Sequence, residues 1–205
     1  MKNTSKGFTL VELIVVMAVL LFVLGTAVSI FISLVQHQRI ILSEQELLNQ
    51  TSFVLERMSK ALRAAKKEDP TTAVCLVDSS GVSYPGYNYL LTRPVKEVYT
   101  GIKFINQSDN NVCQEFYLDN SDIANPVLKE IKNNSQPVAL TSDRLMINAI
   151  RFSINGRNGS TGGITDDNNI QPRVTIFLDI QAKGGSNQSA KKIQTTISQR
   201  DLNIE

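Results

Sequence analysis

The feature that most constrains the fold is an uncharged apolar run from Leu13 to Ile32. It is about 20 residues long, and at about 1.5 Å per residue a helix of that length matches the roughly 30 Å hydrocarbon core of a bilayer. One carboxylate, Glu12, stands immediately before the run. Because a carboxylate at the border of a membrane span is costly, Glu12 is expected to be there for a function.

Flanking charges predict how such a span is oriented. Lys2 and Lys6 precede it, so the positive-inside tendency places the N-terminus in the cytoplasm and everything after Val35 outside. The rest of the 205-residue chain has room for one globular domain. A net charge of +2, without a patch of interleaved basic and aromatic residues, gives no indication of a nucleic-acid partner.

Two ordinary explanations of the apolar run remain open. A cleavable secretory signal with its small-x-small site at Gly25-Thr26-Ala27 would release a secreted binding domain, and an uncleaved anchor would hold that domain at the membrane. The run continues past Ala27 to Ile32, whereas a secretory signal usually has an apolar region of about 7–15 residues. Neither explanation gives Glu12 a role.

The residues around Glu12 carry a resemblance. Lys6-Gly7-Phe8-Thr9-Leu10-Val11-Glu12, after a short basic leader and before an apolar helix, resembles the prepilin signal of type IV pilins and type II secretion pseudopilins. The resemblance implies that a prepilin peptidase cuts between Gly7 and Phe8 and methylates the new amino group of Phe8.

After that cleavage, Glu12 would follow the positive amino terminus by four residues. In a packed filament its carboxylate can meet the amino terminus of a neighbouring subunit in an apolar setting, where an unpaired partner is strongly unfavourable. Glu12 is therefore interpreted as an assembly residue. The alternative is a carboxylate that interacts with the helix dipole and reaches the lipid headgroups.

Beyond the apolar run, the sequence predicts that the helix continues. Apolar positions recur every three or four residues and form one stripe, which is typical of an amphipathic helix. The stripe consists of Leu47, Leu48, Thr51, Val54, Leu55, Met58, Ala61, Leu62 and Ala65, and the opposite face of Gln45, Asn49, Ser52, Glu56, Lys60, Arg63 and Lys67. No proline occurs before Pro70, so one helix is expected from Phe8 to about Lys66, with Asp69-Pro70 ending it.

The period of the pattern then changes to that of strands joined by short polar turns. Strands are predicted at Thr72–Val77, Tyr87–Thr92, Val98–Ile105, Val112–Leu118, Val127–Ile131, Ala149–Ile154, Arg173–Ala182 and Ile193–Ser198. The predicted fold is α+β and pilin-like, with one long N-terminal helix packed on an antiparallel sheet. Its segments would be a leader at 1–7, a transmembrane or filament-core helix at 8–35, an amphipathic continuation at 36–68 and the sheet domain at 69–205.

A second resemblance lies in the later strands, which are similar to those of minor pseudopilins of the J-type and related minor pilins. The segments concerned are 115–118, 128–131, 149–152, 172–176 and 194–200. This resemblance implies a minor subunit at the filament tip that helps to initiate assembly. The absence of tryptophan departs from the J-type pattern.

The sequence offers little for catalysis. Its one histidine, His37, stands just beyond the apolar run, so neither a His-x-x-x-His metal motif nor a Ser-His-Asp triad can be assembled. We expect a protein that is not an enzyme and has no cofactor.

Two further pairs of residues leave alternatives open. Cys75 and Cys113 fall in predicted strands outside the membrane, where they could form a disulfide or remain two buried thiols. Asp166 and Asp167 lie in a glycine- and asparagine-rich segment, 155–169, and carboxylate oxygens are ligands for calcium. Their spacing is not that of an EF-hand, which favours a solvated loop between two strands over a metal site.

The leading functional hypothesis is therefore a structural minor pilin or pseudopilin subunit. Its expected partners are other such subunits, a prepilin peptidase, an inner-membrane assembly platform and, before assembly, lipid. It would cross the inner membrane once, with its N-terminus in the cytoplasm, and then enter an extracytoplasmic filament. Two alternatives stay open: a tip adhesin or DNA-uptake pilin, and a secreted or anchored binding domain released by ordinary signal cleavage.

Overall fold

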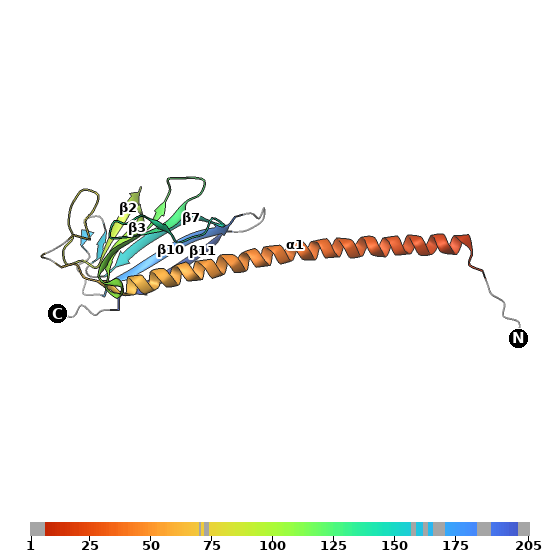
Figure 1. Ribbon diagram of the computed structural model, residues 1–205, viewed down its shortest axis with the longest axis horizontal. Coiled ribbons are helices and arrows are strands. Elements are labelled where there is room, and N and C mark those ends of the chain that lie inside the picture. Colours follow the sequence, from red (N-terminus) through yellow and green to blue (C-terminus); the bar gives the residue numbers. More distant parts are fainter. Residues whose placement is uncertain are drawn as a thin grey trace. The chain divides into compact units, whose positions relative to one another are not determined.

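The computed structural model describes residues 7–69, 71, 74–156, 159–161, 164–165, 171–183 and 190–200. The chain divides into two compact units, Met1–Glu44 and Gln45–Glu205. Helix α1, Leu10–Arg63, contributes residues to both units (Figure 1). Its 54 residues contain no proline and one glycine, Gly25, so nothing in the sequence breaks the run of backbone hydrogen bonds.

The end of α1 lies three residues before the predicted one, since it ends at Arg63 rather than near Lys66. The residues that follow form a short strand, β1 (Ala65–Lys66), whose Ala65 pairs with Asn106 of β3 (Val98–Asn106). The last carbonyls of the helix are bonded by other segments, because Arg63 O accepts from Arg200 N at 2.9 Å and Ala64 O from Gln107 N at 2.9 Å. Hydrogen bonds to distant segments therefore end α1 at Arg63, before the chain reaches Pro70.

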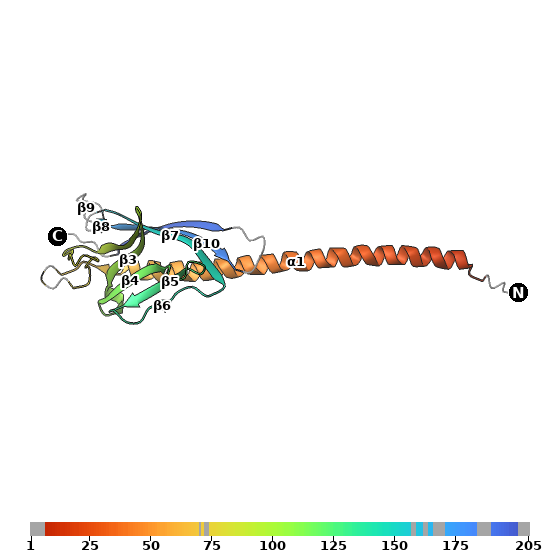
Figure 2. The same cartoon turned by 90° about the horizontal axis from the view of Figure 1, so that it is seen from above.

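The described part of the second unit contains one sheet of 11 strands in the order β11-β10-β7-β3-β2-β8-β9, with β1, β4, β5 and β6 joined to it off this path. Figure 1 shows β2, β3, β7, β10 and β11 side by side, and Figure 2 shows β4, β5 and β6. The remaining bounds are β2 Tyr89–Val95, β4 Val112–Asp119, β5 Val127–Lys132, β6 Val138–Ala139, β7 Leu145–Asn155, β8 Gly159–Thr161, β9 Ile164–Thr165, β10 Arg173–Ala182 and β11 Lys191–Ser198. All pairs are antiparallel except β2 with β8, which is parallel. The predicted α+β fold, a long helix on a mainly antiparallel sheet, is confirmed.

Two predictions about strands were wrong. The described part of 72–77 forms no strand, and only Val77 makes an isolated bridge, to Ser83. The segment predicted as a loop, 155–169, contains β8 and β9, which are too short for a periodic signal.

The apolar stripe of α1 packs on the sheet within the second unit. Leu47, Val54, Met58 and Leu62 are buried, and all predicted members of the opposite face are exposed. Leu48 was predicted in the stripe but is 51% exposed. The sheet contributes alternate residues of its strands to the same core, namely Tyr89, Leu91, Ile102, Phe104, Phe116, Leu118, Leu128, Ile147, Ile150, Phe152, Val174, Ile176, Leu178, Ile180 and Ile197.

Candidate functional site

The N-terminal end of α1 is closed by two side chains that bond each other and the backbone. The Glu12 carboxylate accepts from Thr9 N at 3.0 Å and from Thr9 Oγ at 2.9 Å, while Glu12 N donates to Thr9 Oγ at 3.3 Å. This is a capping box, in which a threonine and a glutamate three residues later satisfy the first backbone groups of a helix. Glu12 thus caps the first turn of α1 and also supplies its negative charge.

The bond between Gly7 and Phe8 lies outside this capped helix. Phe8 is 75% exposed, and a Cβ built on Gly7 would meet nothing within 4 Å. Because α1 begins at Leu10, two residues after Phe8, the Gly7–Phe8 bond lies in a non-helical segment. A peptidase therefore has an open peptide bond at the predicted position.

The first half of α1 carries an apolar surface that the unit itself does not cover. One stretch of the helix has a mean hydropathy of 2.9 and no buried residue, so α1 is long and apolar enough to cross a membrane. Leu13, Val19 and Ile30 are each more than half exposed. Between Gly7 and Val35 the only charged residue is Glu12. A surface of this kind is typical of a helix that is surrounded by lipid or by other helices.

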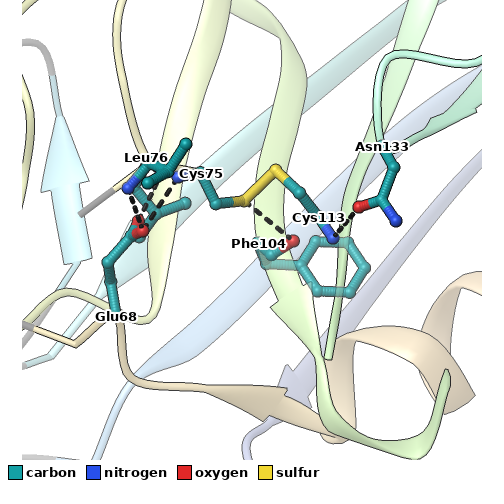
Figure 3. Close-up of a disulfide and its surroundings, with 7 residues drawn as sticks. Glu68, Cys75, Leu76, Phe104, Cys113 and Asn133 are labelled. Carbon is teal, nitrogen blue, oxygen red and sulfur yellow. Dashed lines mark hydrogen bonds between the residues drawn. A yellow bond between two sulfur atoms is a disulfide. The ribbon is translucent and has the colours of Figure 1, made fainter. Parts of the chain in front are cut away.

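A second constellation joins the irregular segment before β2 to strand β4 (Figure 3). Cys75 and Cys113 form a disulfide with Cα atoms 5.5 Å apart, and Cys75 Sγ lies 3.7 Å from Phe104 O. Cys113 belongs to β4, so the bridge fastens an irregular segment to the sheet.

The irregular segment is held on its other side by Glu68. Its buried carboxylate accepts from the backbone N–H groups of Val74 and Cys75, each at 2.8 Å, and from that of Leu76. Three donors on one carboxylate hold Cys75 beside Cys113, in the described part of 72–77 where no strand forms.

A third constellation lies between α1 and strands β4 and β5. The buried Glu130 carboxylate accepts from Arg57 Nη2 at 2.6 Å and from Gln114 Nε2 at 2.5 Å, and Lys132 Nζ is 3.7 Å away. Gln114 Oε1 in turn accepts from Asn106 Nδ2 at 2.8 Å. These groups line a hollow of about 430 Å³. The Glu130 carboxylate is paired with a cation of the helix, so the cluster fastens the helix to the sheet.

None of these constellations has the parts of a catalytic centre. Within the described residues, no three His, Cys, Asp or Glu side chains lie close enough to hold a metal ion. His37 is exposed on α1, and the two cysteines are bonded to each other. Asp166 and Asp167, the calcium candidates, lie outside the described residues, as does the predicted leader before Gly7.

Thr9, Glu68 and Glu130, with the polar partners of Glu130, were not identified as site residues by the sequence analysis. Thr9 could have been found, because Thr-x-x-Glu before an apolar run is a capping-box pattern. Glu68 and Glu130 had no sequence signal, since their partners are backbone amides in one case and a residue 73 positions away in the other.

Comparison with known proteins bears on the N-terminal segment. Residues 2–28 match the model of the prokaryotic N-terminal methylation motif, which is typical of type IV pilins and pseudopilins. The match spans Gly7, Phe8 and Glu12 and stops before the sheet domain. No curated protein and no solved structure matched the chain.

Proposed function

We propose that this chain is a minor subunit of a type IV pilus or type II secretion pseudopilus, processed by a prepilin peptidase between Gly7 and Phe8. The observation that carries the proposal is the N-terminal methylation motif at residues 2–28, on a capped helix whose apolar surface is exposed. The similarity of the later strands to J-type subunits supports a minor role at the filament tip.

The chemistry of storage and assembly follows from the same residues. Before assembly, lipid covers the apolar half of α1, and Thr9 satisfies the Glu12 carboxylate. In a filament, helices of neighbouring subunits replace the lipid, and the amino terminus of Phe8 on one subunit approaches Glu12 of the next. Removing either charge leaves its partner uncompensated in an apolar setting, so the pair fixes the register of the helices.

The compartment supports this arrangement. Lys2 and Lys6 favour a cytoplasmic N-terminus, where the peptidase would act. The Cys75–Cys113 disulfide is typical of an oxidising compartment, which agrees with a sheet domain on the other side of the membrane.

The proposal is tested by the intact mass and N-terminal sequence of the membrane-extracted chain, produced with its prepilin peptidase. The expected product begins with N-methylated Phe8, and co-production with an inactive peptidase should leave the chain uncut. A chain that begins at Val28, or still at Met1 with an active peptidase, would contradict the proposal.

Assembly is tested separately with Glu12→Gln, which keeps the shape of the side chain and removes its charge. We expect this variant to be cut normally and to be lost from sheared filaments. Its matched control, Glu44→Gln, changes a carboxylate of the same helix beyond the apolar half and should enter filaments as the natural chain does. Normal entry of Glu12→Gln into filaments would contradict the role given to its charge.

A further inference from the structure

β11 is an end strand of the sheet. Its only partner among the described strands is β10, which lies beside it in Figure 1. In an antiparallel pair, residues alternate between those that turn both backbone groups toward the partner strand and those that turn them away. One backbone hydrogen bond between the strands therefore shows which residues of β11 turn their N–H and C=O groups away from β10.

That bond is made by Gln199, whose N–H donates to Pro172 O at 3.3 Å, just before β10 begins. The register continues from this pair, since Ile197 is opposite Val174. Counting back from Gln199 in steps of two, the odd-numbered residues of β11 turn their backbone groups toward β10. The even-numbered residues turn their N–H and C=O groups away, and they are Lys192, Gln194, Thr196 and Ser198. Within the described part of the chain, no backbone group bonds them there.

A cavity of about 880 Å³ lies at the Ser198 end of this open edge. One side is formed by exposed residues of α1, and the other by the end of β11, where Arg200 N donates to Arg63 O at 2.9 Å. The lining residues are Glu56, Ser59, Lys60, Arg63, Ala64, Ser108, Thr196, Ser198 and Arg200. Three of them are cations and one is a carboxylate, so the cavity is basic.

The cations of this cavity are available for a partner. Lys60, Arg63 and Arg200 make no ion pair with any carboxylate in the described part of the chain. Lys60 and Arg63 stand in the last turn of α1, where a cation interacts favourably with the helix dipole. That interaction does not account for Arg200, which belongs to the sheet side of the cavity.

We propose that the open edge of β11 and this basic cavity form a docking site for an extended acidic segment of a partner protein. The segment adds a strand to the sheet through the outward backbone groups of Lys192 to Ser198, and its carboxylates bind Lys60, Arg63 and Arg200. Strand addition takes its affinity from main-chain hydrogen bonds and its selectivity from side chains.

The positive charge of β11 and of the cavity favours an acidic partner over a second copy of the chain. β11 itself carries Lys191 and Lys192 and no acidic residue, so pairing two β11 edges would bring only cations to the basic cavity. An acidic strand instead meets cations at both ends of the edge. The proposal does not depend on the processing of Phe8, because every residue in it belongs to the second unit.

The test uses the full chain in detergent micelles and a fluorescent eight-residue peptide of alternating glutamate and valine, with a lysine–valine peptide as its counterpart. Fluorescence anisotropy should show binding of the acidic peptide alone, weakened by salt. Arg63→Glu should weaken it at least about tenfold, as expected for the loss of one charge-assisted hydrogen bond. The matched control, Lys96→Glu, makes the same charge change in the turn between β2 and β3 and should leave binding unchanged.

The backbone contribution is tested by Gln194→Pro, which removes an outward N–H of β11 and no backbone bond to β10. Gln194 is chosen over Thr196, because the Thr196 hydroxyl is hydrogen-bonded to that of Thr175 in β10 at 3.1 Å. Proline is tolerated on edge strands, so the variant should keep its melting temperature and lose binding. If the variant is unstable, an acidic peptide with N-methylated alternate residues makes the same test on the natural chain. Equal binding of the basic or N-methylated peptide, equal loss in Lys96→Glu, or self-association through β11 without peptide binding would overturn the proposal.

Discussion

Glu68 and Glu130 are both 3% exposed, yet different groups stabilise their carboxylates. Glu68 accepts from three successive backbone amides, whereas Glu130 accepts from a guanidinium and a side-chain amide. A buried carboxylate without such partners would be strongly destabilising. These two residues therefore determine local structure, one by shaping the chain before β2 and the other by fastening α1.

Glu68→Gln tests the first role. The amide nitrogen of glutamine cannot accept from a backbone N–H, so at least one of the three bonds is lost, at about 1.5–3 kcal/mol for a bond to a charged group. We expect that loss in the free energy of unfolding by urea, together with slower formation of the Cys75–Cys113 disulfide on oxidative refolding. Glu56→Gln, at an exposed position of α1, should change neither quantity. An unchanged refolding rate in Glu68→Gln would show that Glu68 does not position Cys75.

Asp119 makes stability depend on pH. The hydrogen bond from Lys129, at 2.5 Å, and that from Ser121 N lower the pKa of the Asp119 carboxyl from 3.8 to about 2. The lowered pKa means that the folded chain stabilises the charged carboxylate relative to the unfolded chain. The resulting contribution to folding stability is present above the unfolded pKa and is lost as the pH falls from about 4 to about 2. Asp119→Asn should therefore be less stable than the natural chain at pH 7, and the difference should vanish toward pH 2. Urea titrations at both pH values measure it, and a difference independent of pH would rule out this ion pair as the cause.

At the scale of elements, the connection between α1 and the sheet combines an apolar stripe with the Arg57–Glu130 pair. Periodicity predicted the stripe well, because burial of one helix face every three or four residues is a local pattern. Leu48 was misplaced because it lies at the border of the stripe, where the sheet does not cover it. The polar pair had no local pattern, since its members are 73 positions apart.

Arg57→Met removes the cation and keeps most of the aliphatic length. We expect Arg57→Met to lower the free energy of unfolding by about 1.5–3 kcal/mol, the range for a hydrogen bond to a charged group. This is less than for a fully buried partner, because the Arg57 side chain is 43% exposed. Lys60→Met, also on α1 and without an ion pair among the described residues, is the control and should cost less than about 0.5 kcal/mol, the range of surface substitutions. Equal costs in the two variants would mean that the pair contributes nothing beyond packing.

At the scale of the whole molecule, the parts that could be predicted are those whose signals are local. The long helix follows from apolar spacing and the lack of proline, and the long strands follow from alternation. The end of α1 at Arg63, the parallel β2–β8 pair and the edge position of β11 depend on pairings between distant segments, which one sequence does not reveal. At the N-terminus, Gly7, Phe8 and Glu12 were named from a contiguous motif, whereas the role of Thr9 as a cap required the geometry.

The disulfide constrains the chain across 38 positions, so its removal is expected to destabilise the whole sheet domain. In the chain-entropy model, a disulfide that closes a loop of this length stabilises the folded state by up to about 4 kcal/mol. The double variant Cys75→Ser and Cys113→Ser should show this loss in urea unfolding, and the reduced natural chain should show the same. If the reduced chain alone were destabilised, the effect would come from the reagent and not from the bridge.

Gln199 joins the end of the described chain to the beginning of the sheet domain. Its side chain donates to Ala65 O at 2.7 Å, across 134 positions, and accepts from Asn88 in the interior. Ala65, just after α1, and Asn88, just before β2, therefore share hydrogen bonds with a residue that is synthesised much later. A nascent chain that has reached only Ala182 lacks both this contact and β11, including the buried Ile197. The buried hydrogen bonds around Gln199 can therefore form only after nearly the whole chain has been synthesised.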